Sequence, residues 1–407
     1  MQKGQTVVVV VLALVALLAV AGLALDGTNI YRARRILQNA ADKGALGGSL
    51  FIAMNKGVTT ITRQQVWNEV SRYVQMNGGN PQTAVAYLVV NEDCDGRADE
   101  DRVDGVDNDS DGRIDEDPTS VGNPLLQLDA NTVRQTGNLT IDRSVEGVWC
   151  STRGTIQVLF GGFLMKPEET VQAQARADIR AVGVVPPGQG VAPIAVHYEI
   201  VRRAQRGDIL TVWDGYSYQA TLQQGNQSTN YGEPANPYAG WLNLEWIHNA
   251  ERDHIENREV DQSPGTNELR QWIRDGSPFS IYAGPISLPP NPPSTQGDFI
   301  FGEPGIRAAA LHELRNYVGR TFIFVVYDRW HDRNSLNQMF PNHGSFPQKT
   351  FYHAIGFVAV RLTEVRSSGN PKYVRGSFEY FTTGGSMIPG AGIACDDMMA
   401  RTVVLVE

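Results

Sequence analysis

Residues Thr6 to Leu25 read TVVVVVLALVALLAVAGLAL, an uninterrupted apolar run without a charged side chain. At a rise of about 1.5 Å per residue, a helix of this length spans roughly 30 Å, which matches the hydrocarbon core of a bilayer. The β-branched run Val7 to Val11 does not oppose helix formation there, because a single segment in lipid must close its backbone hydrogen bonds internally. The run therefore predicts a long, membrane-compatible helix.

The helical pattern continues beyond Leu25 without a proline. Apolar residues recur at spacings of three and four from Ile30 to Leu46, with polar residues between them. We therefore predict one helix over residues 1–55, apolar at first and amphipathic afterwards. Three interpretations of its start remain open: a secretory signal cleaved near Ala19-Val20-Ala21, a plain membrane anchor, and a pilin-like helix that later packs against other copies.

Several short motifs follow one another in this region: KGQ at 3–5, GLALD at 22–26, RR at 34–35, LQNAAD at 37–42 and ALGG at 45–48. Together they resemble the N-terminal signature of the Tad-domain family, the TadE/TadG-like proteins of Flp (tight adherence) pilus systems. The resemblance covers roughly the first fifty residues. It implies a bacterial cell-surface protein with its N-terminus inside, anchored in the inner membrane by the helix or assembled in an extracellular filament. The implied partners are other pilus proteins and further copies of the chain, joined through the N-terminal helix.

Composition indicates a folded body after the helix. The chain has 407 residues, of which 42% are hydrophobic and 9% aromatic, and its 41 glycines and 21 prolines indicate many turns and short strands. The pattern predicts a helix over 64–76 and strands over 83–90, 169–182, 320–327 and 350–362. We predict an α+β fold, in which a long hydrophobic, pilin-like helix precedes two β-rich extracellular domains.

The stretch VVPPGQG at 184–190 is the clearest linker between the two domains. The predicted organisation is an assembly helix over 1–55, a first α+β domain over 56–185 with an acidic insertion at 91–118, and a second β-rich domain over 186–407. The insertion explains the charge of the chain. Residues 91–117 hold thirteen acidic residues and three arginines, about ten negative charges, whereas the whole chain has a net charge of −9. The remainder is nearly neutral and has no evident basic face, so we expect no nucleic-acid partner.

Two copies of one pattern lie sixteen residues apart in the insertion: NEDCDGRADED at 91–101 and DNDSDGRIDED at 107–117. Oxygen-bearing residues at alternate positions, a glycine for a tight turn and a returning carboxylate are what Ca²⁺ requires. The loops are not EF-hands, because Arg102 and Pro118 stand where the bidentate glutamate belongs. They resemble the aspartate-rich calcium loops of thrombospondin type 3 repeats. The predicted ligands are Asn91, Asp93, Asp95, Asp99, Glu100, Asp107, Asp109, Asp111, Asp115, Glu116 and the carbonyls of Arg97 and Arg113. The alternative is a solvated acidic loop.

Catalytic patterns are weak. The run from His312 to Asn316 fails the zinc-protease motif, since Asn316 stands where the second histidine is required. Asp328, His331 and Asp332 could form a site near a strand end, although a surface cluster is the simpler interpretation. The five tryptophans of the second domain could stack on sugars, although core packing is the simpler role. The cysteines Cys94, Cys150 and Cys395 allow one disulfide, whose pairing the sequence leaves open.

We therefore predict a non-enzymatic structural protein: a pilin-like subunit or pilus-associated protein of a Tad/Flp-type, type IV-like filament, stabilised by calcium and supporting adhesion. One alternative is a membrane-anchored adhesin that binds surface glycans, or a pilus-assembly factor. The other is a secreted or anchored hydrolase.

Overall fold

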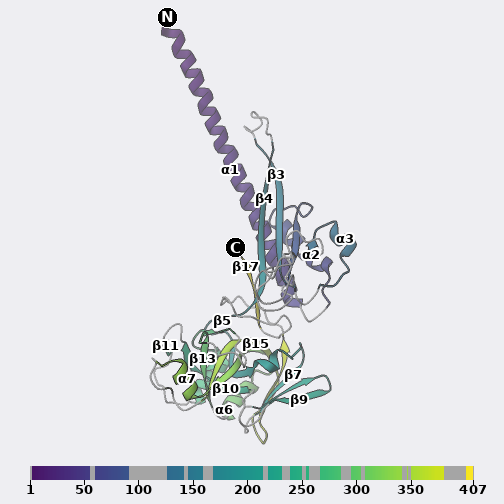
Figure 1. Ribbon diagram of the computed structural model, residues 1–407, viewed down its shortest axis with the longest axis vertical. Coiled ribbons are helices and arrows are strands. Elements are labelled where there is room, and N and C mark those ends of the chain that lie inside the picture. Colours follow the sequence, from purple (N-terminus) through teal and green to yellow (C-terminus); the bar gives the residue numbers. More distant parts are fainter. Residues whose placement is uncertain are drawn as a thin grey trace.

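The computed structural model (Figure 1) describes residues 2–55, 60–90, 126–141, 145–158, 168–213, 219–231, 239–249, 254–255, 266–285, 295–303, 308–341, 346, 350–379 and 400–406. A long N-terminal helix is followed by two β-sheets with short helices, which confirms the predicted fold class. The second sheet lies at the end of the molecule opposite the N-terminus (Figure 1).

The N-terminal helix α1 extends from Gln2 to Asn55 without a break. Its first half stands clear of the rest of the molecule, and its second half packs against the first sheet (Figure 1). The absence of proline and the three-and-four spacing of apolar residues account for this continuity. At its end, the Asn55 side-chain amide donates to the Phe51 carbonyl at 2.8 Å, which satisfies one carbonyl of the last turn.

The first sheet has five antiparallel strands in the order β17-β4-β3-β1-β2. The strands are β1 (Val85–Val90), β2 (Gln127–Leu128), β3 (Val145–Gln157), β4 (Glu168–Ala181) and β17 (Arg401–Val406). Helices α2 (Arg63–Met76) and α3 (Thr132–Thr136) complete this domain. Its core lies between α1, α2 and the sheet, where apolar residues such as Ile52, Val70 and Val148 are fully buried.

Helix α2 begins and ends as its sequence predicts. Thr62 and Gln65 form a reciprocal capping box at its N-terminus, and Gly78 follows its C-terminus with a φ of 84°. The predicted strands over 83–90 and 169–182 are confirmed as β1 and β4.

The second sheet has ten strands, and its path runs β11-β10-β6-β14-β15-β16-β7-β8-β9 with β13 alongside. The elements are β6 (Val191–His197), α4 (Tyr198–Val201), β7 (Ile209–Trp213), β8 (Ala220–Gln224), β9 (Gln227–Tyr231), β10 (Ala239–Asn249), β11 (His254–Ile255), α5 (Thr266–Asp275), β13 (Asp298–Glu303), α6 (Ala308–Arg315), β14 (Thr321–His331), α7 (Arg333–Met339), β15 (Phe351–Arg366) and β16 (Tyr373–Glu379). The predicted strands over 320–327 and 350–362 are confirmed as β14 and β15.

Five of these strands pair in a closed cycle. Strand β10 pairs with β6, β6 with β14, β14 with β15, β15 with β13, and β13 with β10. Only the β6–β14 pairing in the cycle is parallel. Closure removes two exposed edges from the sheet, which is how small β-domains avoid edge-to-edge association.

The chain passes between the two sheets twice. After β4, the short strand β5 (Val184–Val185) pairs with β12 (Ile281–Tyr282), so the predicted linker begins as a strand. The chain returns at Ala400, whose N–H donates to the Phe357 carbonyl at 2.6 Å and whose carbonyl accepts from Val182 at 2.9 Å. Strand β17 then joins β4, so these C-terminal residues lie in the first sheet, whereas β16, the described strand before them, lies in the second.

Candidate functional site

The candidate site is the N-terminal half of α1, whose apolar side chains face outward. From Val8 to Leu25 the large hydrophobic side chains are all more than half exposed, and Leu17 reaches 70%. This bare segment is about 27 Å long at about 1.5 Å per residue. In the described part of the chain it is the one helix that is long and apolar enough to cross a membrane. A row of exposed apolar side chains of this length requires an apolar environment, either lipid or other helices.

The bare segment ends where the β3–β4 hairpin begins to cover the helix. Ile30 and Leu37 pack against Ile156, Val171 and Ala173 of the hairpin. Polar side chains then join helix and sheet. The Thr152 hydroxyl donates to the Leu37 carbonyl at 3.0 Å, and the buried Ser49 hydroxyl donates to the Ala177 carbonyl at 2.7 Å. The covered half of α1 is therefore fixed to the first domain.

Three glycines of α1 let α2 approach closely. A Cβ at Gly47 would lie 2.1 Å from the Tyr73 ring, and one at Gly48 would lie 2.7 Å from Val70. A Cβ at Gly44 would lie 2.7 Å from Val74 and 3.0 Å from the Cys150 sulfur. These contacts give a physical reason for the glycines in the motif at 45–48, which sequence reasoning had used only for its resemblance.

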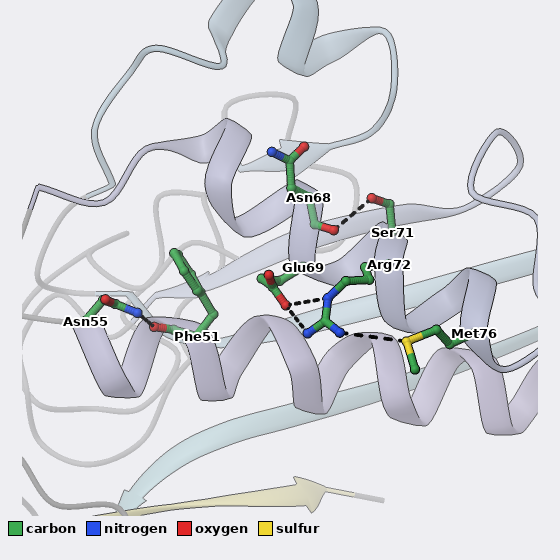
Figure 2. Close-up of polar contacts among 7 residues, drawn as sticks. All are labelled: Phe51, Asn55, Asn68, Glu69, Ser71, Arg72 and Met76. Atoms are coloured by element: carbon green, nitrogen blue, oxygen red, sulfur yellow. Dashed lines mark hydrogen bonds and ion pairs between the residues drawn. The ribbon is translucent and has the colours of Figure 1, made fainter.

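The outer face of α2 is polar and closes this packing from the solvent side. Figure 2 shows Arg72 between Glu69 and Met76, with its guanidinium 2.6 Å from the Glu69 carboxylate. The Ser71 hydroxyl donates to the Asn68 carbonyl at 3.1 Å. Arg72 also lies over the ring of Tyr73, 4.3 Å from its centroid. Tyr73, whose ring packs against Gly47, is therefore covered in turn by Arg72.

A family model described as "Putative Flp pilus-assembly TadE/G-like" matches residues 4–54. Residues 4–54 match a Tad domain. The match ends one residue before α1 does, so this domain coincides with the helix described above. This match supports a pilus-associated protein. No curated protein and no solved structure matches the chain.

The predicted calcium ligands, from Asn91 to Glu116, lie outside the described residues, as do Cys94 and Cys395. Among the residues that the structure does describe, no group of three or more His, Cys, Asp or Glu side chains is placed to hold a metal ion. Cys150 is a free, fully buried thiol beneath the Tad domain. Burial, and to a lesser degree the nearby Asp42 carboxylate, raises its pKa to about 12, so the thiol is unreactive.

Asp328, His331 and Asp332 each contact a different partner in the second domain. Asp328 and His331 are buried, so the interpretation as a surface cluster is wrong for them. The Asp328 carboxylate lies 2.7 Å from Nδ1 of His353, a residue that the sequence pattern did not single out. His331 packs edge-on against Phe299 at 5.4 Å, and Asp332 caps α7 by accepting from the Ser335 N–H. Three separate structural roles replace one predicted cluster.

A buried polar network joins strands of the closed cycle around Asp328. Both ring nitrogens of His353 face acceptors, Nδ1 the Asp328 carboxylate and Nε2 the Gln296 carbonyl at 2.7 Å, so both nitrogens donate. His197 accepts from the Glu199 N–H at Nδ1, so its Nε2 carries a proton and donates to the Asp328 carbonyl at 3.0 Å. Burial lowers the pKa of His197, in keeping with a neutral ring. The network holds β6, β14 and β15 together and has a structural role.

The tryptophans of the second domain also have different surroundings. Trp241 and Trp272 are buried in the core of the second domain, as core packing predicts. Trp213 is half-buried, donates to the Thr221 hydroxyl at 2.9 Å and packs edge-on against Tyr373. Trp330 is 37% exposed. The described tryptophans are therefore separated by their packing and do not support a stacking surface for sugars.

Proposed function

We propose that this protein is a pilin-like structural subunit, or a pilus-associated protein, of a Tad/Flp-type surface filament. The observation that carries the proposal is a single rigid helix whose first half is bare and apolar and whose second half is bonded to a folded domain. Such a helix can stand in a bilayer before assembly and pack against the same helices of other copies afterwards. The Tad domain matched at residues 4–54 supports this use of the helix.

The mechanism of assembly follows from the separation of the two halves of α1. When the bare segment leaves lipid, its apolar side chains stay out of water only if other helices cover them. The small residues Ala16, Ala19 and Gly22 within it permit close helix contact. The first domain keeps its own core, so transfer from membrane to filament does not require refolding of the body. The second domain lies at the far end from the N-terminus (Figure 1). In a filament packed through α1, this position would leave it available for the outer contacts that serve adhesion.

Calcium stabilisation is the second part of the proposal, and it rests on the duplicated pattern at 91–101 and 107–117. Ten negative charges close together in sequence repel one another unless cations neutralise them. Calcium bound there would stiffen the connection between β1 and β2, the strands on either side of the segment. The test is calorimetric titration of the full chain with Ca²⁺. An absence of binding at millimolar calcium would refute this part.

Filament incorporation is tested by a charge within the bare segment. The variant Leu17→Arg, compared with the apolar replacement Leu17→Val, should abolish recovery of the protein in sheared, detergent-free filaments while Leu17→Val preserves it. Immunogold labelling with an antibody to the second domain locates the wild-type chain. Gold along filaments supports a structural subunit and gold at tips a minor one. Gold confined to the envelope would instead favour the anchored adhesin or assembly factor.

A further inference from the structure

An exposed basic cluster lies on α1 directly beyond the bare segment. It consists of Arg32, Arg34 and Arg35, all exposed, and Tyr31, which is 70% exposed. The hairpin contacts the helix at Ile30 and Leu37. Arg32 and Arg35 lie on a face away from these contacts, whereas Arg34 lies four positions from Ile30 and borders the covered face, with its side chain still exposed. The cluster therefore faces outward just where the chain leaves the apolar segment.

Among the residues that the structure describes, no carboxylate neutralises these three arginines. No ion pair or hydrogen bond joins their side chains to any described residue. No acidic residue stands three or four positions from any of them along the helix. Arg32 and Arg35 are three positions apart, a spacing at which like charges repel. An external anion would relieve this repulsion, and the cluster is therefore complementary to a negatively charged partner.

The position of the cluster along the axis of α1, relative to the end of the bare segment, indicates the class of that partner. Arg32 lies about 10 Å along the helix axis from Leu25, the end of the bare segment. The polar head-group layer of a bilayer extends roughly 5 to 8 Å beyond the hydrocarbon core. Helical side chains tilt toward the N-terminus, and long arginine side chains extend further toward the interface, so the guanidinium groups reach this layer. Tyrosine is enriched at the same depth, which accounts for the exposed ring of Tyr31.

We infer that Tyr31, Arg32, Arg34 and Arg35 form a docking face for the head-group phosphates of anionic phospholipids. The inference rests on the membrane stage of the proposed function and adds the class of lipid that the unassembled protein selects. Guanidinium groups bind phosphate oxygens through paired N–H donors, so arginine suits this contact better than lysine. The contacts fix the depth of α1 in the membrane and are lost when the helix leaves for the filament.

The test uses the full chain reconstituted in phosphatidylcholine vesicles with trace spin-labelled phosphatidylglycerol or spin-labelled phosphatidylcholine. Electron paramagnetic resonance measures the fraction of each label that the protein immobilises. We expect a preference for phosphatidylglycerol of up to about fivefold for each arginine in contact with the head groups. The preference should fall at 1 M salt, where screening extends over only about 3 Å. In R32Q/R34Q/R35Q it should approach one.

A matched control removes three exposed arginines of the second domain, R274Q/R315Q/R320Q, and should leave the preference unchanged. The charge-conserving variant R32K/R34K/R35K should retain most of it. Equal immobilisation of the two lipids by wild type, or a preference that survives R32Q/R34Q/R35Q, overturns the inference. Carbonate extraction separates this failure from that of the proposed function. A wild-type chain that inserts without lipid preference refutes the inference alone, and one that carbonate removes from the vesicles refutes both.

Discussion

Replacing Gly44 by alanine adds one methyl group at the junction of α1, α2 and β3. The new Cβ would lie 2.7 Å from a methyl group of Val74 and 3.0 Å from the sulfur of Cys150. Both neighbours are fully buried, so neither side chain can turn into solvent. Overpacking of this kind costs typically about 1 to 3 kcal/mol, and the helix preference of alanine over glycine returns about 1 kcal/mol. The net loss in the packing of α2 is therefore expected to be up to about 2 kcal/mol.

Hydrogen exchange of the α2 amides measures this loss locally in the full chain. A loss of about 2 kcal/mol makes exchange through opening roughly 30 times faster, and a loss of about 1 kcal/mol roughly 5 times faster. The matched control is Gly27→Ala, in the same helix but with no atom within 4 Å of the new Cβ, which should leave α2 unchanged. In a Val74→Ala background the clashing methyl is gone, so Gly44→Ala should cost clearly less. If Gly44→Ala is as harmless as Gly27→Ala, or if its cost is the same with Val74 removed, the close-approach argument is incorrect.

Three further predictions concern the rest of the chain. Calcium at a hundred times its dissociation constant should stabilise the protein by about 2.7 kcal/mol relative to chelator in thermal unfolding, and Asp95→Asn with Asp111→Asn should remove most of that gain. Burial, followed by the positive charge of His353, lowers the pKa of His331 from 6.5 to about 4. Between about pH 6.5 and 4 the unfolded state therefore binds a proton that the folded state does not, so the free energy of unfolding should fall by at most about 3 kcal/mol as the pH drops through this range. In denaturant titrations, His331→Phe should make the free energy of unfolding depend less on pH. Removing residues 400–406 exposes the edge of β4, so size-exclusion chromatography in detergent should show more self-association than the full chain shows under the same conditions.

The N-terminal helix and much of the first domain could be predicted because their signals are local. The apolar run, the three-and-four spacing beyond it and the capping residues of α2 each lie within one element. The closeness of α1 and α2 is different, since it depends on which glycines meet Val74 and Tyr73 across the interface. The spacing of residues in α1 locates its glycines but does not predict which residues of α2 they contact.

The second domain shows where sequence reasoning ends. The individual strands β14 and β15 were predictable from their apolar runs, but the closed cycle depends on β13, whose two partners lie far from it in sequence. The Asp328–His353 contact joins residues twenty-five positions apart, and only the pairing of β14 with β15 brings them together. Periodicity reports which face of a strand is buried and carries no information about its neighbour.

The double passage of the chain between the sheets also determines how the molecule bears a mechanical load. A force that pulls the second domain away from α1 acts on the Ala181 end of β4 and on the Arg401 end of β17 in the same direction, since these ends face the second domain together. Strand β4 could then move only by sliding along β3, where the register is continuous from Gly147↔Asp178 to Gln157↔Glu168. The hydrogen bonds of that register would be loaded in shear, all at once, and not opened one after another. The same arrangement that returns the C-terminal strand to the first sheet thus makes the connection between the domains resistant to tension.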